Sequence, residues 1–361
     1  MTSTSPKAVA RAWVEVRRAL VALAVALLVA FLLILATSQT PFQTFATLLT
    51  GPLGTKRTLG LWIDDMAKLT MTGLAFSLVF QARQFSMGVQ GQVYMGGLAA
   101  ALVALSPLGT SAIAMPLALI AAICAGGIWG FIPGYAKARL GANEIVSSLM
   151  LNYIAVNLVT YIVRVPLAAG PGMLYSAPFP QAVLLPALVA RTRIDMGLIL
   201  SLATVLLCWF ALYRTSWGLK LRLVGSNAHF AKWSGIRPTA IMVSAMTASG
   251  MIGGLLGAMF VQGSAYGKLV VQFEGQLAFE GILVAIVARA RPLAVPVVAL
   301  FYGYLRQGGA LIGLRTDVPA ELISVVQAII ILLMASTLSL PARGFWARLR
   351  KAPALSSEAR S

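Results

Sequence analysis

Long apolar runs separated by short polar segments dominate this chain. The first run, ALVALAVALLVAFLLILA at residues 19–36, carries no charge. About 20 apolar residues suffice to cross a hydrocarbon layer about 30 Å thick. By this criterion the pattern predicts about ten transmembrane helices, at residues 19–36, 65–83, 87–105, 112–136, 144–163, 197–213, 239–260, 276–290, 293–312 and 321–338. The eighth run is short and close to the ninth, so two full spans and one broken element both fit residues 276–312.

The composition supports a membrane protein. Hydrophobic residues make up 59% of the 361 residues and charged residues 11%, whereas soluble domains are closer to half apolar and a quarter charged. We therefore expect an all-α polytopic membrane protein with no soluble domain. The membrane domain is expected at 19–338, between a basic N-terminal segment at 1–18 and a basic tail at 339–361.

The charge distribution predicts an orientation. The formal net charge of +18 would suggest nucleic acid binding in a soluble protein, but in membrane proteins Lys and Arg collect on the cytoplasmic side. With the N-terminus inside, 19 of the 28 Lys and Arg residues lie in cytoplasmic segments or helix ends. We expect both termini and the segment 214–238 in the cytoplasm of a bacterial inner membrane, and the segment 164–196 outside.

The sequence offers no catalytic or metal-binding signature. It has no HExxH, GxSxG or P-loop motif, and its single histidine is His229. Cys124 and Cys208 both lie within apolar runs, without the spacing of metal ligands. We therefore expect no enzyme activity and no cofactor; if ATP is used, another chain binds it.

A few polar residues interrupt the apolar runs and are candidates for a translocation path. Charges within the runs are scarce, which disfavours ion-coupled secondary transport and favours a neutral solute. Hydrogen bonding between helices is the alternative role for each candidate. Three candidates follow one another at i, i+4 and i+8 on one flank of the fifth run. The six are Gln90, Gln92, Glu144, Ser148, Asn152 and Glu280.

The segment 214–238 predicts a short capped helix. Asn227 can begin it, Gly235 can close it, and Pro238 follows. Ala228 and Ala231 are three residues apart, hence on one face, which would leave room for a partner's groove. The alternative is an amphipathic helix lying on anionic lipid, anchored by the aromatic residues Phe230 and Trp233.

Glycines at four-residue spacing indicate close helix contacts. Gly250 and Gly254 lie in the seventh predicted span, and Gly126, Gly130 and Gly134 lie in the fourth. Such spacing lets two helix backbones approach closely. It fits packing inside the bundle, or alternatively a subunit interface.

Four stretches together resemble a known family. VGSNAHFAKWSGI at 224–236 resembles the G-x-N-x-x-A-x-x-x-G-I coupling element of ABC importer permeases of the branched-chain amino acid, simple-sugar and nucleoside class. FSMGVQGQVYMGGLAA at 85–100, GANEIVSSLMLNYIA at 141–155 and FEGILVAIVARARPLAVPVVALFYGYLRQGG at 279–309 resemble further elements of that class, in the same order. The chain departs from the family pattern at Ser86, Gln90 and Ala288, where Asn, Glu and Gly are usual.

The resemblance implies an importer subunit with several partners. It is closest to the longer of two paired permeases in the nucleoside subgroup, and it implies a second permease, a cytosolic ABC ATPase and a periplasmic or lipoprotein substrate-binding protein. A branched-chain amino acid permease, an ion-coupled secondary transporter and a membrane scaffold without transport remain as alternatives. The residues implied to transmit ATPase closure are Gly225, Ser226, Asn227, Ala228, Ala231, Gly235 and Ile236.

Reporter fusions test the predicted orientation. A reporter active only in the cytoplasm should work after Asn227 and after Ala352, and one active only in the periplasm should work after Lys56 and after Ala190. The expectation follows from the distribution of Lys and Arg. Activity of the periplasmic reporter after Asn227 would contradict the topology.

Overall fold

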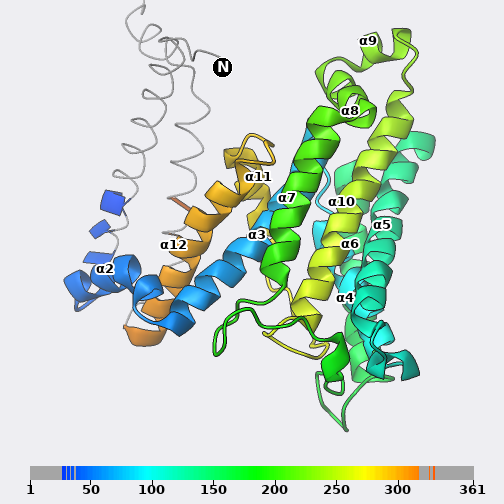
Figure 1. Ribbon diagram of the computed structural model, residues 1–361. Coiled ribbons are helices and arrows are strands. Elements are labelled where there is room, and N and C mark those ends of the chain that lie inside the picture. Colours follow the sequence, from blue (N-terminus) through cyan, green and yellow to red (C-terminus); the bar gives the residue numbers. More distant parts are fainter. Residues whose placement is uncertain are drawn as a thin grey trace, which may run out of the picture. The chain divides into compact units, whose positions relative to one another are not determined.

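The computed structural model describes residues 27–29, 31–32, 34–35, 38–316, 325 and 328–329. It divides into two compact units, one formed by residues 48–311 and one by residues 1–47 with 312–361. The described residues are helical, with connecting loops and isolated β-bridges but no strand (Figure 1), which confirms the all-α fold. Most of the first and tenth predicted spans, and both terminal segments, lie outside the described residues.

The described part of the chain contains eleven α-helices with defined bounds, with three short 3₁₀ helices between them. In chain order the elements are α2 (Pro41–Thr50), η1 (Gly51–Leu53), α3 (Lys56–Gln81), α4 (Val89–Leu105), η2 (Pro107–Thr110), α5 (Ala114–Leu140), α6 (Glu144–Arg164), η3 (Gln181–Val183), α7 (Gly197–Arg214), α8 (Ser216–Ser226), α9 (Ala228–Trp233), α10 (Pro238–Gln262), α11 (Leu277–Val287) and α12 (Val295–Arg315).

Five described helices are long and apolar enough to cross a membrane: α5, α6, α7, α10 and residues 295–314 of α12. They correspond to the fourth, fifth, sixth, seventh and ninth predicted spans. The apolar helices α4 and α11 are shorter. The structure therefore supports a multi-pass membrane protein, and the total of about ten spans stays a prediction.

The helix that contains the second predicted span begins earlier than expected, at Lys56 rather than near residue 65. A capping box starts it: Thr55 accepts a hydrogen bond from the backbone N–H of Thr58, and the Thr58 side chain accepts one from the N–H of Thr55. Hydropathy missed this start because the first turns carry charges. Because the helix begins at Lys56, Asp64 and Asp65 lie well inside it and not at its start.

The eighth predicted span is a broken element. Helix α11 has 11 residues and so rises only about 16 Å, roughly half the thickness of a hydrocarbon layer. An irregular segment at 263–276 precedes it, and a second irregular segment at 82–88 precedes α4. Of the two arrangements that the sequence left open for residues 276–312, the structure shows the broken one.

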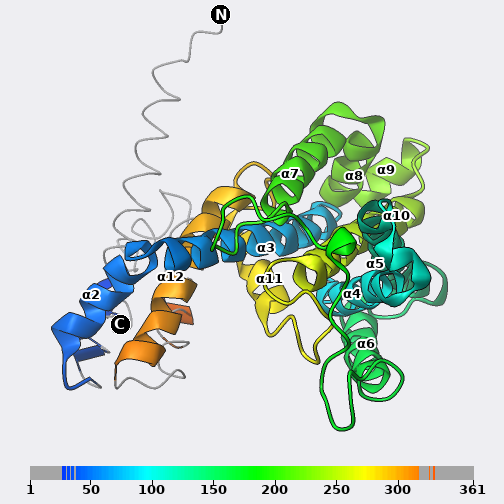
Figure 2. The same ribbon diagram turned by 60° about the horizontal axis from the view of Figure 1, so that its bottom comes forward.

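Helix α10 forms the centre of the unit 48–311, packed along α5 and α4 (Figure 2). Glycines make this contact possible. A Cβ atom on Gly254 would overlap the carbonyl oxygen of Ala122 on α5, and one on Gly126 would overlap the carbonyl oxygen of Gly250. These four-residue glycine patterns thus serve packing inside the bundle, which confirms the first of the two interpretations.

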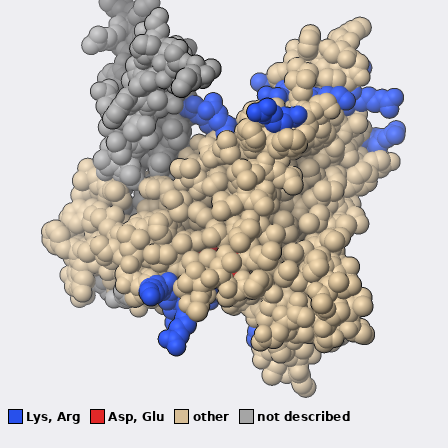
Figure 3. Space-filling model, viewed as in Figure 1, with Lys and Arg blue, Asp and Glu red and all other residues tan. Residues whose placement is uncertain are grey.

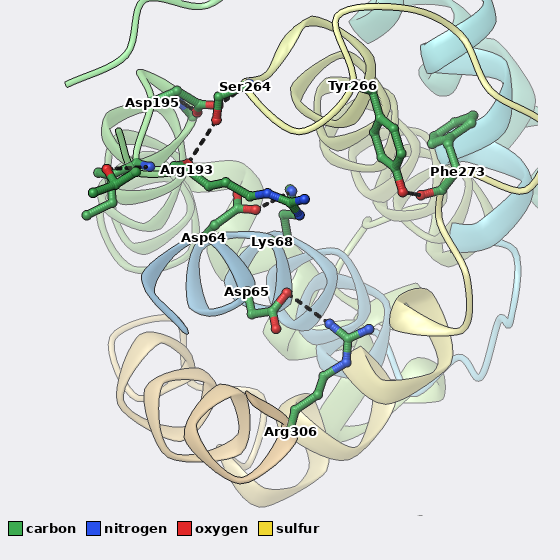
Figure 4. Close-up of polar contacts among 12 residues, drawn as sticks. Asp64, Asp65, Lys68, Arg193, Asp195, Ser264, Tyr266, Phe273 and Arg306 are labelled. Carbon is green, nitrogen blue, oxygen red and sulfur yellow. Dashed lines mark hydrogen bonds and ion pairs between the residues drawn. The ribbon is translucent and has the colours of Figure 1, made fainter. Parts of the chain in front are cut away.

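One end of this unit gathers the segments 165–196 and 263–270. The backbone N–H of Ser176 donates to the carbonyl of Leu269 over 2.8 Å, and Asp195 accepts from the N–H of Ser264 over 2.8 Å (Figure 4). The opposite end gathers 136–143, 214–238 and 288–294 (Figure 1). The two ends collect the segments that the charge pattern assigned to opposite sides of the membrane.

Candidate functional site

The irregular segment before α11 meets the beginning of α4. Phe273, in the segment before α11, packs its ring against Tyr94 of α4 with centroids 4.8 Å apart, and against Phe260 of α10 at 5.7 Å. Next to it, Gln90 donates from its side-chain amide to the carboxylate of Glu274 over 3.2 Å. The first turn of α4 therefore lies beside the segment that leads into α11.

Glu274 is the residue that sequence reasoning missed at this point. It lies between the seventh and eighth predicted spans, but the structure buries it at 2% exposure. Its carboxylate accepts hydrogen bonds from the backbone N–H of Ala278, in the first turn of α11, and from Gln90. The sequence did contain one indication of this burial, because Glu274 stands just before an apolar run that is too short to span the membrane.

Two of the predicted residues on α6 hold the first turn of α4. The side-chain oxygen of Asn152 accepts from the N–H of Gly91 over 2.8 Å, and its amide donates to the carbonyl of Met87 over 2.7 Å. The Ser148 hydroxyl accepts from the N–H of Met87 over 3.0 Å. Both side chains are buried. The polar flank expected on this helix exists, and these two residues use it to bind backbone groups that have no intrahelical partner at a helix start.

Gln92 lies nearby with unsatisfied hydrogen-bonding capacity. Its side chain is 3% exposed and packs where α4 passes Gly130 and Gly253. In the described part of the chain, its amide oxygen has no hydrogen-bond partner, and neither do the indole N–H of Trp129 and the Ser249 hydroxyl. Each such buried group costs about 1–3 kcal/mol. These atoms are available to bind water or a polar solute.

The predicted acidic candidates are occupied by basic partners. Glu144 pairs with Lys137 over 2.5 Å, at the start of α6. Glu280 of α11 lies 3.2 Å from Arg306 of α12, and Arg306 also pairs with Asp65 of α3 over 2.9 Å (Figure 4). Glu280 thus belongs to an ion-pair group joining three helices.

The expectation of almost no charge within the spans needs correction. Besides the group around Arg306, α3 contains a buried pair in which Lys68 lies 2.7 Å from Asp64 and 4.8 Å from the Phe260 ring centroid. Hydropathy averaging hid these residues because single charges change the mean of a long apolar window little, and the pairing of Arg306 with Asp65 and Glu280 becomes visible only once the helices are packed. Each of these charges has a partner of opposite sign, although Arg306 balances only one of its two carboxylates, and such partnered groups remain compatible with a path for an uncharged solute.

The segment 214–238 forms the expected capped helix. The Asn227 side chain accepts from the backbone N–H of Phe230 over 3.0 Å and begins α9. At the other end Gly235 has φ +78°, and the N–H groups of Gly235 and Ile236 donate to the carbonyls of Lys232 and Ala231. This pair of bonds is a Schellman motif. The Asn227 cap and the Schellman motif together fix both ends of a six-residue helix, which would be unstable by itself.

The face that α9 exposes differs from the predicted one. Ala231 is fully buried and Ala228 half-buried, so the alanine face packs against the protein itself and leaves no groove for a partner. The outward face carries Phe230 at 57% exposure and Trp233 at 89%. Spacing alone identified the face shared by the two alanines but not its direction.

The segment 214–238 contacts the end of α3, which adjoins the irregular segment 82–88. A Cβ atom on Gly225, near the end of α8, would overlap the carbonyl oxygen of Gln81, the last residue of α3. The Gln81 side chain donates to the carbonyl of Ala290, beyond the end of α11, over 2.9 Å. Gln81 therefore lies between α8, the end of α11 and the irregular segment 82–88.

The sequence matches known proteins over most of the chain. Residues 61–335 match the family described as "Branched-chain amino acid transport system / permease component". The guanosine ABC transporter permease protein NupP of Bacillus subtilis is 31% identical over 322 residues, covering 88% of this chain and 92% of the relative. A glucose ABC transporter permease of Haloferax volcanii is 27% identical, covering 92% and 90%.

A second guanosine ABC transporter permease of Bacillus subtilis, NupQ, is 26% identical over 267 residues, covering 70% of this chain and 82% of the relative. No solved structure matches the chain. The family match extends from α3 through the described helices α4 to α12 and includes both irregular segments and the segment 214–238. The chain therefore belongs to the family of branched-chain amino acid transport system permease components, which are transport subunits of ABC transporters.

Proposed function

We propose that this chain is the membrane-spanning permease subunit of an ATP-driven importer for a neutral polar solute, a nucleoside or a simple sugar. A binding protein delivers the solute, a separate cytosolic ATPase binds and hydrolyses ATP, and a second permease completes the membrane part. Family membership supports the transport role. The guanosine and glucose permeases support the solute class, and the two guanosine permeases of one organism support the pairing.

The exposed face of α9 is the observation that carries the proposal. Trp233, at 89% exposure, stands at the basic end of the unit 48–311, where Figure 3 shows Lys and Arg side chains over α8 and α9. Behind it, Gly225 meets the backbone of Gln81. Force applied to α9 by an ATPase would therefore reach the end of α3 and the irregular segment 82–88.

The path for the solute is proposed beside the starts of α4 and α11. Transporters commonly bind solutes where helices are interrupted, because irregular backbone there offers free polar groups. Gln90, Gln92 and Glu274 lie at such interruptions in this chain. The amide groups of Gln90 and Gln92 can bind the hydroxyl groups of a ribose or a hexose without requiring charge compensation, and the Glu274 carboxylate can accept hydrogen bonds from such hydroxyls.

A branched-chain amino acid is the second candidate solute, because the family description names that class. Its ammonium and carboxylate groups would both need charged partners in the path. In the described residues, Asp64, Asp65, Glu280 and Glu144 are already paired with lysine or arginine, and Glu274 in the proposed path accepts hydrogen bonds from Gln90 and Ala278, with no lysine or arginine bonded to it that could receive a carboxylate. This pairing favours the uncharged solute.

Replacing Trp233 with Ala should uncouple the importer. Truncating a large exposed aromatic at a protein interface typically costs about 2 kcal/mol or more, equivalent to about 30-fold weaker binding. We expect the purified variant permease to retain the ATPase about 30-fold less tightly while still inserting into the membrane. Co-purification of the complex and uptake into vesicles measure this.

The matched control is Leu108→Ala, which removes an exposed apolar side chain from η2 at the opposite end. It should leave ATPase binding unchanged. If α9 is instead a lipid anchor, the Trp233→Ala variant will bind the ATPase as tightly as the unaltered chain does. That result would contradict the proposal that the ATPase acts on α9.

Uptake by the reconstituted complex tests the solute. Guanosine, other nucleosides and simple sugars should compete for transport, whereas leucine and valine should not, because the proposed path at Gln90, Gln92 and Glu274 offers no basic group for the carboxylate of a zwitterion. Transport of leucine that nucleosides and sugars fail to inhibit would contradict the solute class while leaving the permease role intact.

Replacing Asn152 with Leu should reduce uptake more strongly than it reduces assembly with the ATPase. The substitution leaves the N–H of Gly91 and the carbonyl of Met87 without their partner, and each unsatisfied buried group costs about 1–3 kcal/mol. We expect the first turn of α4 to shift and uptake to fall at least tenfold, as measured by radiolabelled solute in vesicles.

Asn157→Leu is the control on the same helix. The Asn157 side chain is exposed and bonds only to the carbonyl of Tyr153 within α6, so this variant should transport normally. Equal loss of uptake in both variants would show that the hydrogen bonds of Asn152 to the first turn of α4 have no special role.

A further inference from the structure

A groove runs between α5, α8 and α10 at the end of the unit 48–311 that carries α9. Its volume is about 830 Å³, and it opens to the outside of the helix bundle. From Arg237, just before α10, to Met251 the lining follows the helix for about 21 Å. The groove therefore begins at the helix ends and continues deep along the apolar part of the bundle.

The charge in this groove is entirely positive. Arg139 of α5 and Arg237 line it near the helix ends, and no carboxylate lines it. Neither guanidinium forms an ion pair with any described residue, and Glu144, near the end of α5, is held by Lys137. Two unpaired guanidinium groups at one mouth favour an anionic ligand with several acceptor oxygens.

The remaining lining is largely apolar or aromatic. Phe131, Val243 and Met251 form the deeper part, and Tyr135 lies beside Arg139. On the α8 side, Trp217 donates from its indole N–H to the Ser244 hydroxyl over 2.9 Å, which fixes the ring in the wall. Tyr and Trp near a charged mouth are typical of the membrane–water interface.

We infer that this groove binds one anionic phospholipid of the cytoplasmic leaflet. The phosphate-bearing headgroup lies between Arg139 and Arg237, and an acyl chain follows α10 toward Met251. A soluble anion would fill only the mouth and leave the apolar part empty, whereas a lipid matches both parts. The assignment to the cytoplasmic leaflet rests on the proposed function, which places α9 on the ATPase side.

Such a lipid would join the coupling segment to the bundle. Arg237 directly follows Ile236, the last residue of the Schellman motif that closes α9. Arg139 lies on α5, and Trp217 lies on α8. A headgroup bound by both arginines would therefore connect α5 with the segment on which α9 is mounted.

Native mass spectrometry of the full importer complex tests the inference. The complex is reconstituted in vesicles of phosphatidylethanolamine and phosphatidylglycerol and then released for analysis. Each arginine near an anionic lipid contributes about fivefold in affinity, so Arg139→Gln combined with Arg237→Gln should lower retained phosphatidylglycerol about 25-fold. Thr247→Phe, which fills the groove without changing its charge, should also remove most of the retained phosphatidylglycerol.

The control is Arg289→Gln combined with Arg291→Gln, two exposed arginines after α11 that do not line the groove. This variant loses the same charge and should retain the lipid. Equal loss in both double variants, or retention by Thr247→Phe, would overturn the inference.

A cysteine variant tests the competing occupant. If Thr247→Cys forms a cross-link with the second permease in these vesicles, the groove is a subunit interface and the lipid inference is wrong; absence of a cross-link together with lipid loss in the arginine variant supports it. The lipid readout does not require transport, so its failure leaves the importer function untouched, and failure of uptake leaves the lipid result standing.

Discussion

The close approach of α10 to α5 and α4 is the contact on which the other features depend. Gly250 and Gly254 let the backbone of α10 lie directly against α5, where a methyl group would overlap a carbonyl oxygen. In lipid, helix association gains little from hydrophobic burial, so such backbone packing supplies much of the attraction. With these three helices held in place, the short helices α4 and α11 can begin inside the bundle without exposing free backbone groups to lipid.

Side chains then bind the backbone hydrogen-bonding groups that helix packing alone leaves without partners. Asn152 and Ser148 bond to backbone groups at the start of α4, and Glu274 bonds to an N–H at the start of α11. Gln90 fits this arrangement better than the Glu that is usual in the resembling class, because an amide can donate a hydrogen bond to Glu274 whereas a second carboxylate would repel it. The neighbouring Glu274 therefore explains why glutamine suits position 90, where the class usually has glutamate.

Sequence reasoning predicted the features that depend on local order and failed where distant segments meet. Apolar runs predicted α5, α6, α7 and α10 closely, and cap residues predicted both ends of α9. The polar flank of α6 was predicted from spacing, but its partners at Met87 and Gly91 come from another helix. Glu274, the groups around Arg306 and Lys68, and the inward direction of Ala231 depend on tertiary packing, which no window of the sequence contains.

The contact between Gly225 and Gln81 is one-sided in a mechanical sense. It joins a glycine to a backbone carbonyl oxygen and resists further approach by steric overlap, but no bond between these atoms resists their separation. In the proposed importer, ATPase closure could therefore push α3 through this point but could not pull it back. The hydrogen bond from the Gln81 amide to Ala290 does resist separation, but it ties the end of α3 to the residues after α11, so a restoring pull on α3 would come from α11 and not from α8.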